Sequence, residues 1–415
     1  MENRKSLVVA LILFFPFIGF AYDGETTHPA LTQEAIKLFQ ASYPDVNFIG
    51  EEIQLIEKGS SLEDEPNSRC LNHFYDPIHN KALHLNETSK SWAKNTLSQA
   101  SVMIAGQDYF SSNTDYSWDR AIFEYAHGDK KRGLETLGHV IHLIQDKAVP
   151  DHTRLDSHAL GSPYESWAKR HTKANINIAS GLIKEKEMPI IYSVLDRYFD
   201  GMASYSNLNF FSLDTILDKG YLKPEIKKEE VFVLKNGVKT LFGVGISQDG
   251  IPYKLVQINK FRNLDNDTIE INYTFDDMDH LVLSDYWPLL SNQAVLHSAG
   301  VIKLFFDEVE KEKRTFALAD KNKIFAQHTD NSVRDLVHNQ LAMLGIGLDT
   351  EDVVAPTPLP TPNIIVPSVP VLSATDQAKI TDLMSQAQAL KAMVEALQQT
   401  LGDYPPVGGL CPAMP

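Results

Sequence analysis

Five side chains able to bind a metal ion lie close together in the sequence, in the order His142, Asp146, His152, His158 and Glu165. The first two are four residues apart, so on a helix they project from one face, one turn apart, as two ligands of a single ion require. The alternative is a polar helix end that carries incidental histidines. Three imidazoles and two carboxylates in so short a stretch favour a metal site.

The residues around this cluster have the apolar spacing of helices. From about residue 31 to 170 apolar side chains recur at helical intervals, and a further long helix is predicted from about 286 to 310. Between about 224 and 275 the pattern changes to alternating strands, with Asn236-Gly237 as a two-residue hairpin turn. We therefore predict a mainly α protein, in which a helical core carries a small β-rich insertion and a C-terminal helix follows a proline-rich linker.

The predicted segments follow one another along the chain, and the helical core resumes after the insertion. Their boundaries are 1–21 for a signal peptide, 22–223 for the helical core, 224–278 for the β-rich insertion, 279–350 for the continuation of the core, 351–372 for the linker and 373–415 for the C-terminal amphipathic helix and tail.

The first segment has the pattern of a cleavable export signal. Basic residues at positions 4 and 5 precede an apolar run from 7 to 20, and small residues, Gly19 and Ala21, stand at the two positions that a signal peptidase reads. The run is shorter than the roughly 20 residues that span a bilayer. Cleavage after Ala21 makes Tyr22 the first residue of the mature protein, which we expect to be exported and either periplasmic or extracellular.

The C-terminal segments have a different composition. Six prolines between residues 356 and 370 predict a stiff, extended linker. Beyond it, from Ile380 to Leu401, apolar residues recur at alternating spacings of three and four over about three heptads. Two interpretations stay open: the helix docks on its own domain, or it is an oligomerisation helix through which the chain self-associates.

Composition restricts the partners and the metal ligands. The chain has 38 basic and 54 acidic residues and a net charge of −16, which disfavours nonspecific binding to a nucleic-acid backbone. Its two cysteines, Cys70 and Cys411, are too few for a disulfide scaffold or a four-cysteine zinc site. Any metal must therefore be held mainly by His, Asp and Glu. Whether the two cysteines pair stays open.

Three separate segments carry a resemblance to a known family. Residues 142–152, His-Leu-Ile-Gln-Asp-Lys-Ala-Val-Pro-Asp-His, resemble the His-x3-Asp-x5-His signature of the zinc-dependent phospholipase C enzymes, a superfamily shared with fungal zinc-dependent single-strand nucleases. Residues 72–77, Asn-His-Phe-Tyr-Asp-Pro, are similar to the phospholipase branch's His-Phe-Tyr-Asp-Pro element. His28 precedes a predicted helix, as the family's first histidine does. The resemblance covers roughly residues 22–169.

The resemblance implies a trinuclear zinc site on an all-helical core. Its implied ligands are His73, His142, Asp146 and an upstream acid for the first zinc, His152, Glu165 and a further histidine for the second, and His28, Asp146 and the amino group and carbonyl of Tyr22 for the third. Export processing would then create one of the ligands.

Three positions depart from the family's pattern. The family has a histidine four residues before its last acid, where this chain has Gly161, and His158 is the nearest substitute. The upstream acid is either Glu63 or Asp64; we favour Asp64, and a solvated acidic turn is the alternative. Tyr22 stands where mature family members tend to begin with tryptophan, and it supplies the same backbone atoms.

The implied reaction is hydrolysis of a phosphodiester, because clustered zinc ions activate water and neutralise phosphoryl oxygens. We expect a phospholipase C that acts at a membrane or micelle surface and releases diacylglycerol and a phosphorylated head group, with Asp64 as zinc ligand or base. Two hypotheses remain beside it. A secreted single-strand nuclease would use the same zinc set with aromatic and basic groups for the strand. A non-catalytic module would bind zinc only for stability.

Overall fold

The computed structural model describes residues 24–66, 68–83, 86–100, 108–157, 161–216, 218–247, 250–263, 268–274 and 279–326. All of them belong to the first of two units of the chain, Met1–Gly347. The predicted signal peptide, Tyr22, His158, Cys411, the linker and the C-terminal helix lie outside the described residues and stay predictions. Among the helices that the structure describes, none has the length and apolar character needed to cross a bilayer.

The described part is mainly helical with one small antiparallel sheet, which confirms the predicted fold class. The longer helices are α1 (Thr27–Ser42), α2 (Gly50–Leu62), α5 (Trp118–His127), α6 (Lys130–Gln145), α9 (Ile178–Glu185), α10 (Leu195–Asn209) and α11 (Leu281–Thr315). The short helices are α3 (Ser89–Trp92), α4 (Thr96–Gln99), α7 (Pro150–Thr153) and α8 (Pro163–Ala168), with 3-10 turns η1 (Cys70–Asn72) and η2 (Asp146–Ala148). A last helix covers 317–326.

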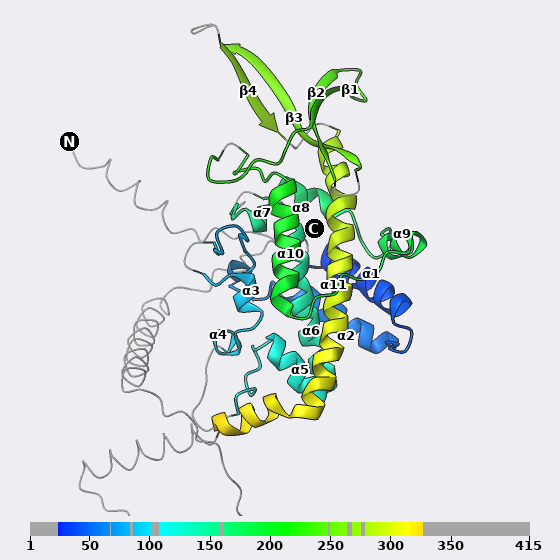
Figure 1. Cartoon of the computed structure of the whole chain (residues 1–415), viewed down its shortest axis with the longest axis vertical. Coiled ribbons are helices and arrows are strands. Elements are labelled where there is room, and N and C mark those ends of the chain that lie inside the picture. The colour runs from blue at the N-terminus through cyan, green and yellow to red at the C-terminus, as the bar shows by residue number, and fades with distance from the viewer. Residues whose placement is uncertain are drawn as a thin grey trace, which may run out of the picture. The chain divides into compact units, whose positions relative to one another are not determined.

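Helix α6 is packed on several sides within this helical core. It contacts α1, α2, α5 and α11, while α11 runs beside α10 (Figure 1). Leu137, Val140, Ile141 and Ile144 are all fully buried, because neighbouring helices cover more than one face of α6. The polar side chains of its last turns are therefore buried as well, and His142 is one of them.

Helices α2 and α6 cross where each has a glycine, Gly59 and Gly138. A Cβ atom on Gly59 would lie 1.8 Å from the backbone oxygen of Glu135, and one on Gly138 would lie 2.1 Å from a backbone oxygen of α2. Neither position has room for a side chain, so the two backbones approach closely. This crossing brings Asp64, just after α2, next to His142 on α6.

The β-rich insertion is a four-stranded antiparallel sheet, which lies between α10 and α11 in the chain. Its strands are β1 (Lys228–Val233), β2 (Lys239–Ile246), β3 (Pro252–Asn263) and β4 (Thr268–Thr274), paired in the order β1-β2-β3-β4. The predicted hairpin is confirmed, but its two-residue turn is wrong. Val233 pairs with Lys239, the N–H of Leu234 donates to the carbonyl of Val238, and that of Gly237 donates to the carbonyl of Leu234, so the loop is the three residues 235–237, in which Gly237 has a φ of +84°. Helix α11 packs against β3, and Tyr286 Oη donates to the carbonyl of Leu255 at 2.7 Å.

Helix α11 is longer than the predicted helix from about 286 to 310. It begins at Leu281 and continues to Thr315, with Pro288 inside it. Proline lacks the N–H that would bond to the preceding turn, so the sequence pattern alone places the helix start too late. Val282 and Leu283 are fully buried, and this packing stabilises the first turn in spite of the proline.

Candidate metal centre

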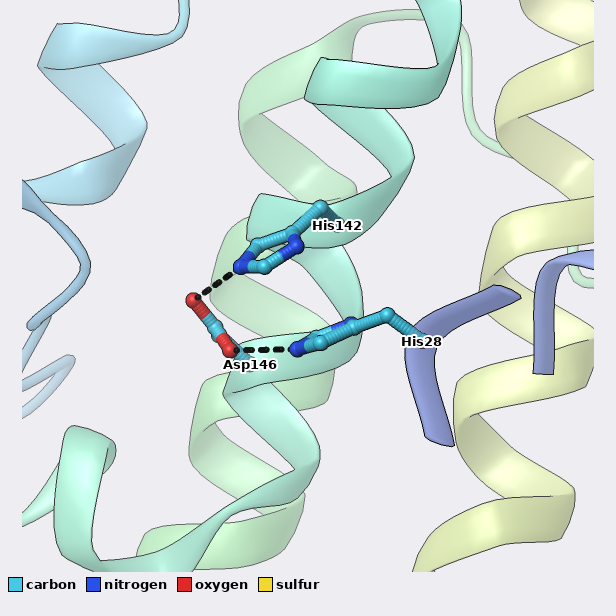
Figure 2. Close-up of side chains that lie close together, drawn as sticks. All are labelled: His28, His142 and Asp146. Atoms are coloured by element: carbon cyan, nitrogen blue, oxygen red, sulfur yellow. Dashed lines mark ion pairs between the residues drawn. The ribbon is translucent and has the colours of Figure 1, made fainter. Parts of the chain in front are cut away.

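The carboxylate of Asp146 lies among four imidazole rings. Its Oδ2 is 2.8 Å from His73 Nδ1, 3.5 Å from His142 Nε2 and 3.7 Å from His152 Nδ1. Its Oδ1 is 3.3 Å from His28 Nε2. All five side chains are buried. Figure 2 shows His28 and His142 stacked on one side of Asp146, with their ring centroids 3.6 Å apart.

Two groups of side chains have ligand atoms close enough to hold a single ion. His28, His142 and Asp146 form one, and Asp64, His73 and His142 form the other. In the second group Asp64 Oδ1 is 3.4 Å from His73 Nδ1 and 3.6 Å from His142 Nε2. Because the groups share His142, they belong to one extended cluster, and the sequence prediction had named all of its members.

His152 and Glu165 form a further part of the same cluster. His152 Nε2 is 3.2 Å from Glu165 Oε1, and its other ring nitrogen faces Asp146. Gly161, at the position where the family has a histidine, has a φ of +97° and cannot contribute a side chain. His158 lies outside the described residues, so the structure brings together two of the three side chains predicted for the second zinc.

Local sequence explains why these side chains converge. Asp146 and His142 are one turn apart at the C-terminal end of α6, and Pro150 begins α7, which carries His152. Ser162 caps α8 by accepting from the backbone N–H of Glu165 at 3.2 Å, which places the Glu165 side chain in the first turn.

The other nitrogen of two rings is held by a neighbour. His142 Nδ1 lies 2.6 Å from the carbonyl of Ser60, which accepts its hydrogen and leaves the Nε2 lone pair directed at the carboxylates. The Gln145 side-chain amide lies 2.7 Å from His28 Nδ1. If the amide oxygen faces the ring, it accepts the hydrogen of Nδ1 and the Nε2 lone pair of His28 is available to a metal. If the amide is reversed, its NH2 group donates to Nδ1 and the ring hydrogen is on Nε2.

Sequence reasoning missed these supporting residues. Ser60, Gln145 and Lys147 all contact a predicted ligand, and buried Lys147 donates from Nζ to the carbonyl of His73. The only indication in the sequence that Gln145 and Lys147 support the site is that they are the neighbours of Asp146 in the chain. Nothing in the sequence distinguishes a serine whose carbonyl accepts from an imidazole.

The polar atoms of the cluster fit a bound metal. Both oxygens of Asp146, Nε2 of His142 and both ring nitrogens of His73 are buried and make no hydrogen bond of standard geometry with any described residue. Buried polar atoms ordinarily have partners. Imidazole nitrogens and carboxylate oxygens in this arrangement are the donor set that zinc accepts. These residues therefore fit zinc.

The protonation states also suit metal binding. Burial raises the pKa of Asp146, but the imidazoles of His142, His152 and His73 outweigh burial and hold that pKa well below its usual range. Burial, together with His28, lowers the pKa of His142 well below its usual value. The first is thus a carboxylate and the second a neutral imidazole, the forms that ligate.

Two side chains of the cluster would release a proton when a metal binds. Burial lowers the pKa of His73, but Asp146 and the neighbouring carboxylates raise it to about 10. Burial and the nearby Asp151 raise the pKa of Glu165 well above its usual value. Without metal, His73 thus holds a proton near neutral pH, and the raised pKa of Glu165 favours its protonated form, so loading the site releases protons.

The geometry separates the two candidate upstream acids. Glu63 is fully buried and accepts from Arg69, Trp92 and His139. Asp64 instead faces His73 and His142, and its side chain is 23% exposed. This arrangement favours Asp64 as the ligand.

Cys70 is part of the surroundings of this site. It is buried, and its thiol lies 3.4 Å from Asp64 Oδ1. Cys411, the other cysteine of the chain, lies outside the described residues.

The sequence matches no protein-family model, and no curated protein sequence matches it. Several solved structures are similar in fold, and two of them are alpha-toxins. The alpha-toxin from Clostridium absonum is 14% identical, with 69% of this chain and 66% of that chain covered and a TM-score of 0.37. An alpha-toxin from an avian strain of Clostridium perfringens is 12% identical, with 70% and 65% covered and a TM-score of 0.35. This chain thus spans less than two thirds of either protein, and similarity at this level identifies neither its family nor its activity.

Proposed function

We propose that this protein is an exported, zinc-dependent phospholipase C that hydrolyses glycerophospholipids to diacylglycerol and a phosphorylated head group. The observation that carries the proposal is the buried Asp146 carboxylate with four imidazole nitrogens within 3.7 Å of it. The resemblance in three sequence segments supplies the choice of reaction, since the cluster alone supports only a zinc-dependent hydrolase.

The proposal assigns three zinc ions to the cluster and its immediate surroundings. The ligands are Asp64, His73, His142 and Asp146 for the first, His152, His158 and Glu165 for the second, and Tyr22, His28 and Asp146 for the third. Tyr22 would bind through its amino group, which exists only after the signal peptide is removed. Protein that retains residues 1–21 is therefore expected to bind one zinc ion fewer than processed protein.

The chemistry of the donors favours zinc over magnesium or calcium. Four of the gathered side chains are imidazoles, whereas magnesium and calcium bind oxygen ligands almost exclusively. Zinc binds nitrogen and carboxylate oxygen together, and catalytic zinc sites keep one position open for water or substrate. Bound zinc lowers the pKa of coordinated water and stabilises charge that develops on a phosphodiester.

Asp64 is placed to interact with both the cluster and the solvent. Its Oδ1 faces two buried imidazoles, yet its side chain is 23% exposed, whereas Asp146 is fully buried. Burial and Asp146 raise the pKa of Asp64, the charge on His73 opposes them, and the resulting pKa is about 6. This pKa applies without metal. Asp64 would serve either as the zinc ligand assigned above or, when it is not coordinated, as the base that accepts a proton from an attacking water.

Lipid is the proposed substrate because two sequence features oppose a nucleic acid. A charge of −16 repels a phosphate backbone, and the residues from His73 to Pro77 match the phospholipase branch. The proposed enzyme acts on phospholipid at a membrane or micelle surface.

Metal analysis and two hydrolysis assays test the proposal. Processed protein should contain about three zinc ions and hydrolyse phospholipid in micelles, and a chelator should abolish the activity. Hydrolysis of single-stranded DNA without lipid hydrolysis would identify the nuclease alternative. Zinc bound without turnover of either substrate would identify a non-catalytic zinc module, and absence of bound zinc would overturn all three interpretations.

A further inference from the structure

Glu63, next to the proposed ligand Asp64, is the centre of a buried network. Its Oε2 lies 2.7 Å from Arg69 Nη2 and 2.6 Å from His139 Nδ1, and its Oε1 accepts from Trp92 Nε1 at 3.0 Å. Carboxylates are rarely buried without partners, and here donors from three different segments face one carboxylate. The carboxylate orientation is thereby fixed.

The donors themselves are also held in place. The Arg69 guanidinium lies between the rings of Trp92 and Tyr116, at 5.0 and 5.1 Å from their centroids. It also donates from Nη2 to Gln99 Oε1 at 3.1 Å. On the other side, His139 stacks on Tyr116 with ring centroids 3.8 Å apart. Because of these contacts, the side chains of Arg69 and His139 have little freedom to rotate away from Glu63.

The network joins the segments that carry three proposed ligands. Glu63 directly precedes Asp64, and Arg69 lies just before the η1 turn that leads to His73. His139 lies one turn before His142 on α6. The position of the Glu63 carboxylate thus fixes where the supporting segments lie relative to one another.

Glu63 also faces the second nitrogen of His73. Its Oε1 lies 3.7 Å from His73 Nε2, while His73 Nδ1 faces Asp146 at 2.8 Å and Asp64 at 3.4 Å. A neutral imidazole has one N–H, and an ionised carboxylate can only accept. The 3.7 Å separation is longer than a hydrogen bond. When a metal takes the Nδ1 lone pair, however, the single hydrogen of the neutral ring must be on Nε2, on the side of Glu63.

We infer that Glu63 is a positioning residue that selects the Nε2–H form of His73 and so directs its Nδ1 lone pair into the metal site. The inference rests on the proposed function, because it requires His73 to bind zinc. It distinguishes the two adjacent acids by role: Asp64 contacts the metal, and Glu63 orients a ligand. Partners of this kind typically contribute a factor of about 10 to 100 in metal affinity.

Two measurements test the inference. In zinc-loaded protein, ¹⁵N spectra of the histidine rings should show His73 coordinated through Nδ1 with its hydrogen on Nε2; coordination through Nε2 would overturn the inference, and this result needs no variant. In Glu63→Gln, zinc affinity measured by competition with a chelator should fall about 10- to 100-fold, with full stoichiometry at saturating zinc.

A matched control separates positioning from general stability. Glu34 is also a buried carboxylate, 2.7 Å from the backbone nitrogen of Ala179 and 2.7 Å from Lys37 Nζ. Glu34→Gln should lower the melting temperature of metal-free protein, as Glu63→Gln does, but should leave zinc affinity unchanged. Unchanged zinc affinity in Glu63→Gln overturns the inference, and loss of one zinc equivalent at saturation overturns it by making Glu63 a ligand. Absence of zinc from wild-type protein would instead overturn the proposed function.

Discussion

His73 Nδ1 lies 2.8 Å from Asp146 Oδ2, although the two residues are far apart in the chain. His73 follows the η1 turn, and Asp146 follows α6. Lys147, adjacent to Asp146, donates to the carbonyl of His73 and so binds the two segments directly to each other. The segment of Asp146 therefore contacts His73 twice, through the imidazole ring and through the backbone carbonyl, so the relative position of the two residues is fixed.

Replacement of this carboxylate should remove metal and activity together. In Asp146→Asn we expect zinc content to fall and lipid hydrolysis to decrease more than 100-fold. Loss of a residue that only hydrogen-bonds to a metal ligand costs roughly 10- to 100-fold, and loss of the ligand itself should cost more. Asp146 lies within 3.7 Å of all four imidazoles, and an amide is a poor replacement for the carboxylate that is proposed to hold zinc. Zinc analysis and micelle assays measure both effects.

The matched control for this variant is Asp196→Asn. Asp196 is 42% exposed and pairs with Lys94 on the surface, so its loss should change neither zinc content nor activity. Full zinc content in folded Asp146→Asn would show that Asp146 is not a ligand.

Asp64→Asn should lower the catalytic rate more than it lowers substrate binding. A base that accepts a proton in the rate-limiting step contributes about 10²- to 10⁴-fold, so kcat should fall by that factor while KM changes little. The measurement is steady-state hydrolysis of a micellar phospholipid by zinc-saturated protein. A variant with wild-type kcat would exclude Asp64 as the base, and its zinc content would report separately on ligation.

Removal of metal should destabilise the protein reversibly. Both oxygens of Asp146, Nε2 of His142 and both ring nitrogens of His73 are buried without standard hydrogen bonds among the described residues, so the metal-free site loses favourable interactions that the metal supplies. A ligand at about 100 times its Kd adds about 2.7 kcal/mol of stability. Thermal unfolding should therefore shift downward after chelation and recover with zinc but not with calcium. An identical melting curve with and without chelator would argue against a metal in the core.

The sequence predicted the local geometry of the site better than its long-range contacts. The four-residue spacing of His142 and Asp146 required a shared helix face, and the structure has it. The approach of His28 and His73 to Asp146 could be expected only from the resemblance, because spacing says nothing about residues on separate segments.

Choices that depend on side-chain direction could not be made from the sequence. Glu63 and Asp64 are adjacent acids, and only the structure shows that Glu63 is held by Arg69, Trp92 and His139. Asp64 instead faces His73 and His142. The early start of α11 was missed for a related reason, since burial of its first turn against the core outweighs the local effect of a proline.

The close crossing of α2 and α6 should be sensitive to one methyl group. In Gly138→Ala the new Cβ would lie 2.1 Å from a backbone oxygen of α2, so the helices must move apart. Overpacking of this kind costs about 1–3 kcal/mol, and separation of Asp64 from His142 should also weaken zinc binding. Urea unfolding of metal-free protein and zinc titration measure the two effects.

Gly181→Ala is the control for this substitution. Gly181 lies in α9, and a Cβ atom there would have no neighbour within 4 Å. Alanine is preferred to glycine inside a helix by about 0.5–1 kcal/mol, so this variant should be slightly more stable than wild type. Equal stability of Gly138→Ala and wild type would show that the crossing tolerates a side chain.

His297 should make stability depend on pH at a site away from the metal cluster. It is buried in α11, with Nδ1 2.8 Å from the carbonyl of Gln293 and with the rings of Tyr192 and Tyr198 nearby. Burial lowers its pKa to about 4, and the bond to the Gln293 carbonyl opposes the shift only in part.

The sign of the effect follows from the unfolded chain, in which histidine has a pKa of about 6.5. Above that pH both states are neutral and His297 has no effect. As pH falls from about 6.5 to 4 the unfolded state binds a proton that the folded state excludes, so stability falls by on the order of 3 kcal/mol. Replacing His297 with leucine should remove this part of the pH dependence in urea unfolding of metal-free protein, whereas Asn292→Ala, also on α11 but five residues earlier, should keep it. Equal slopes for wild type and His297→Leu would show that the folded protein binds the proton.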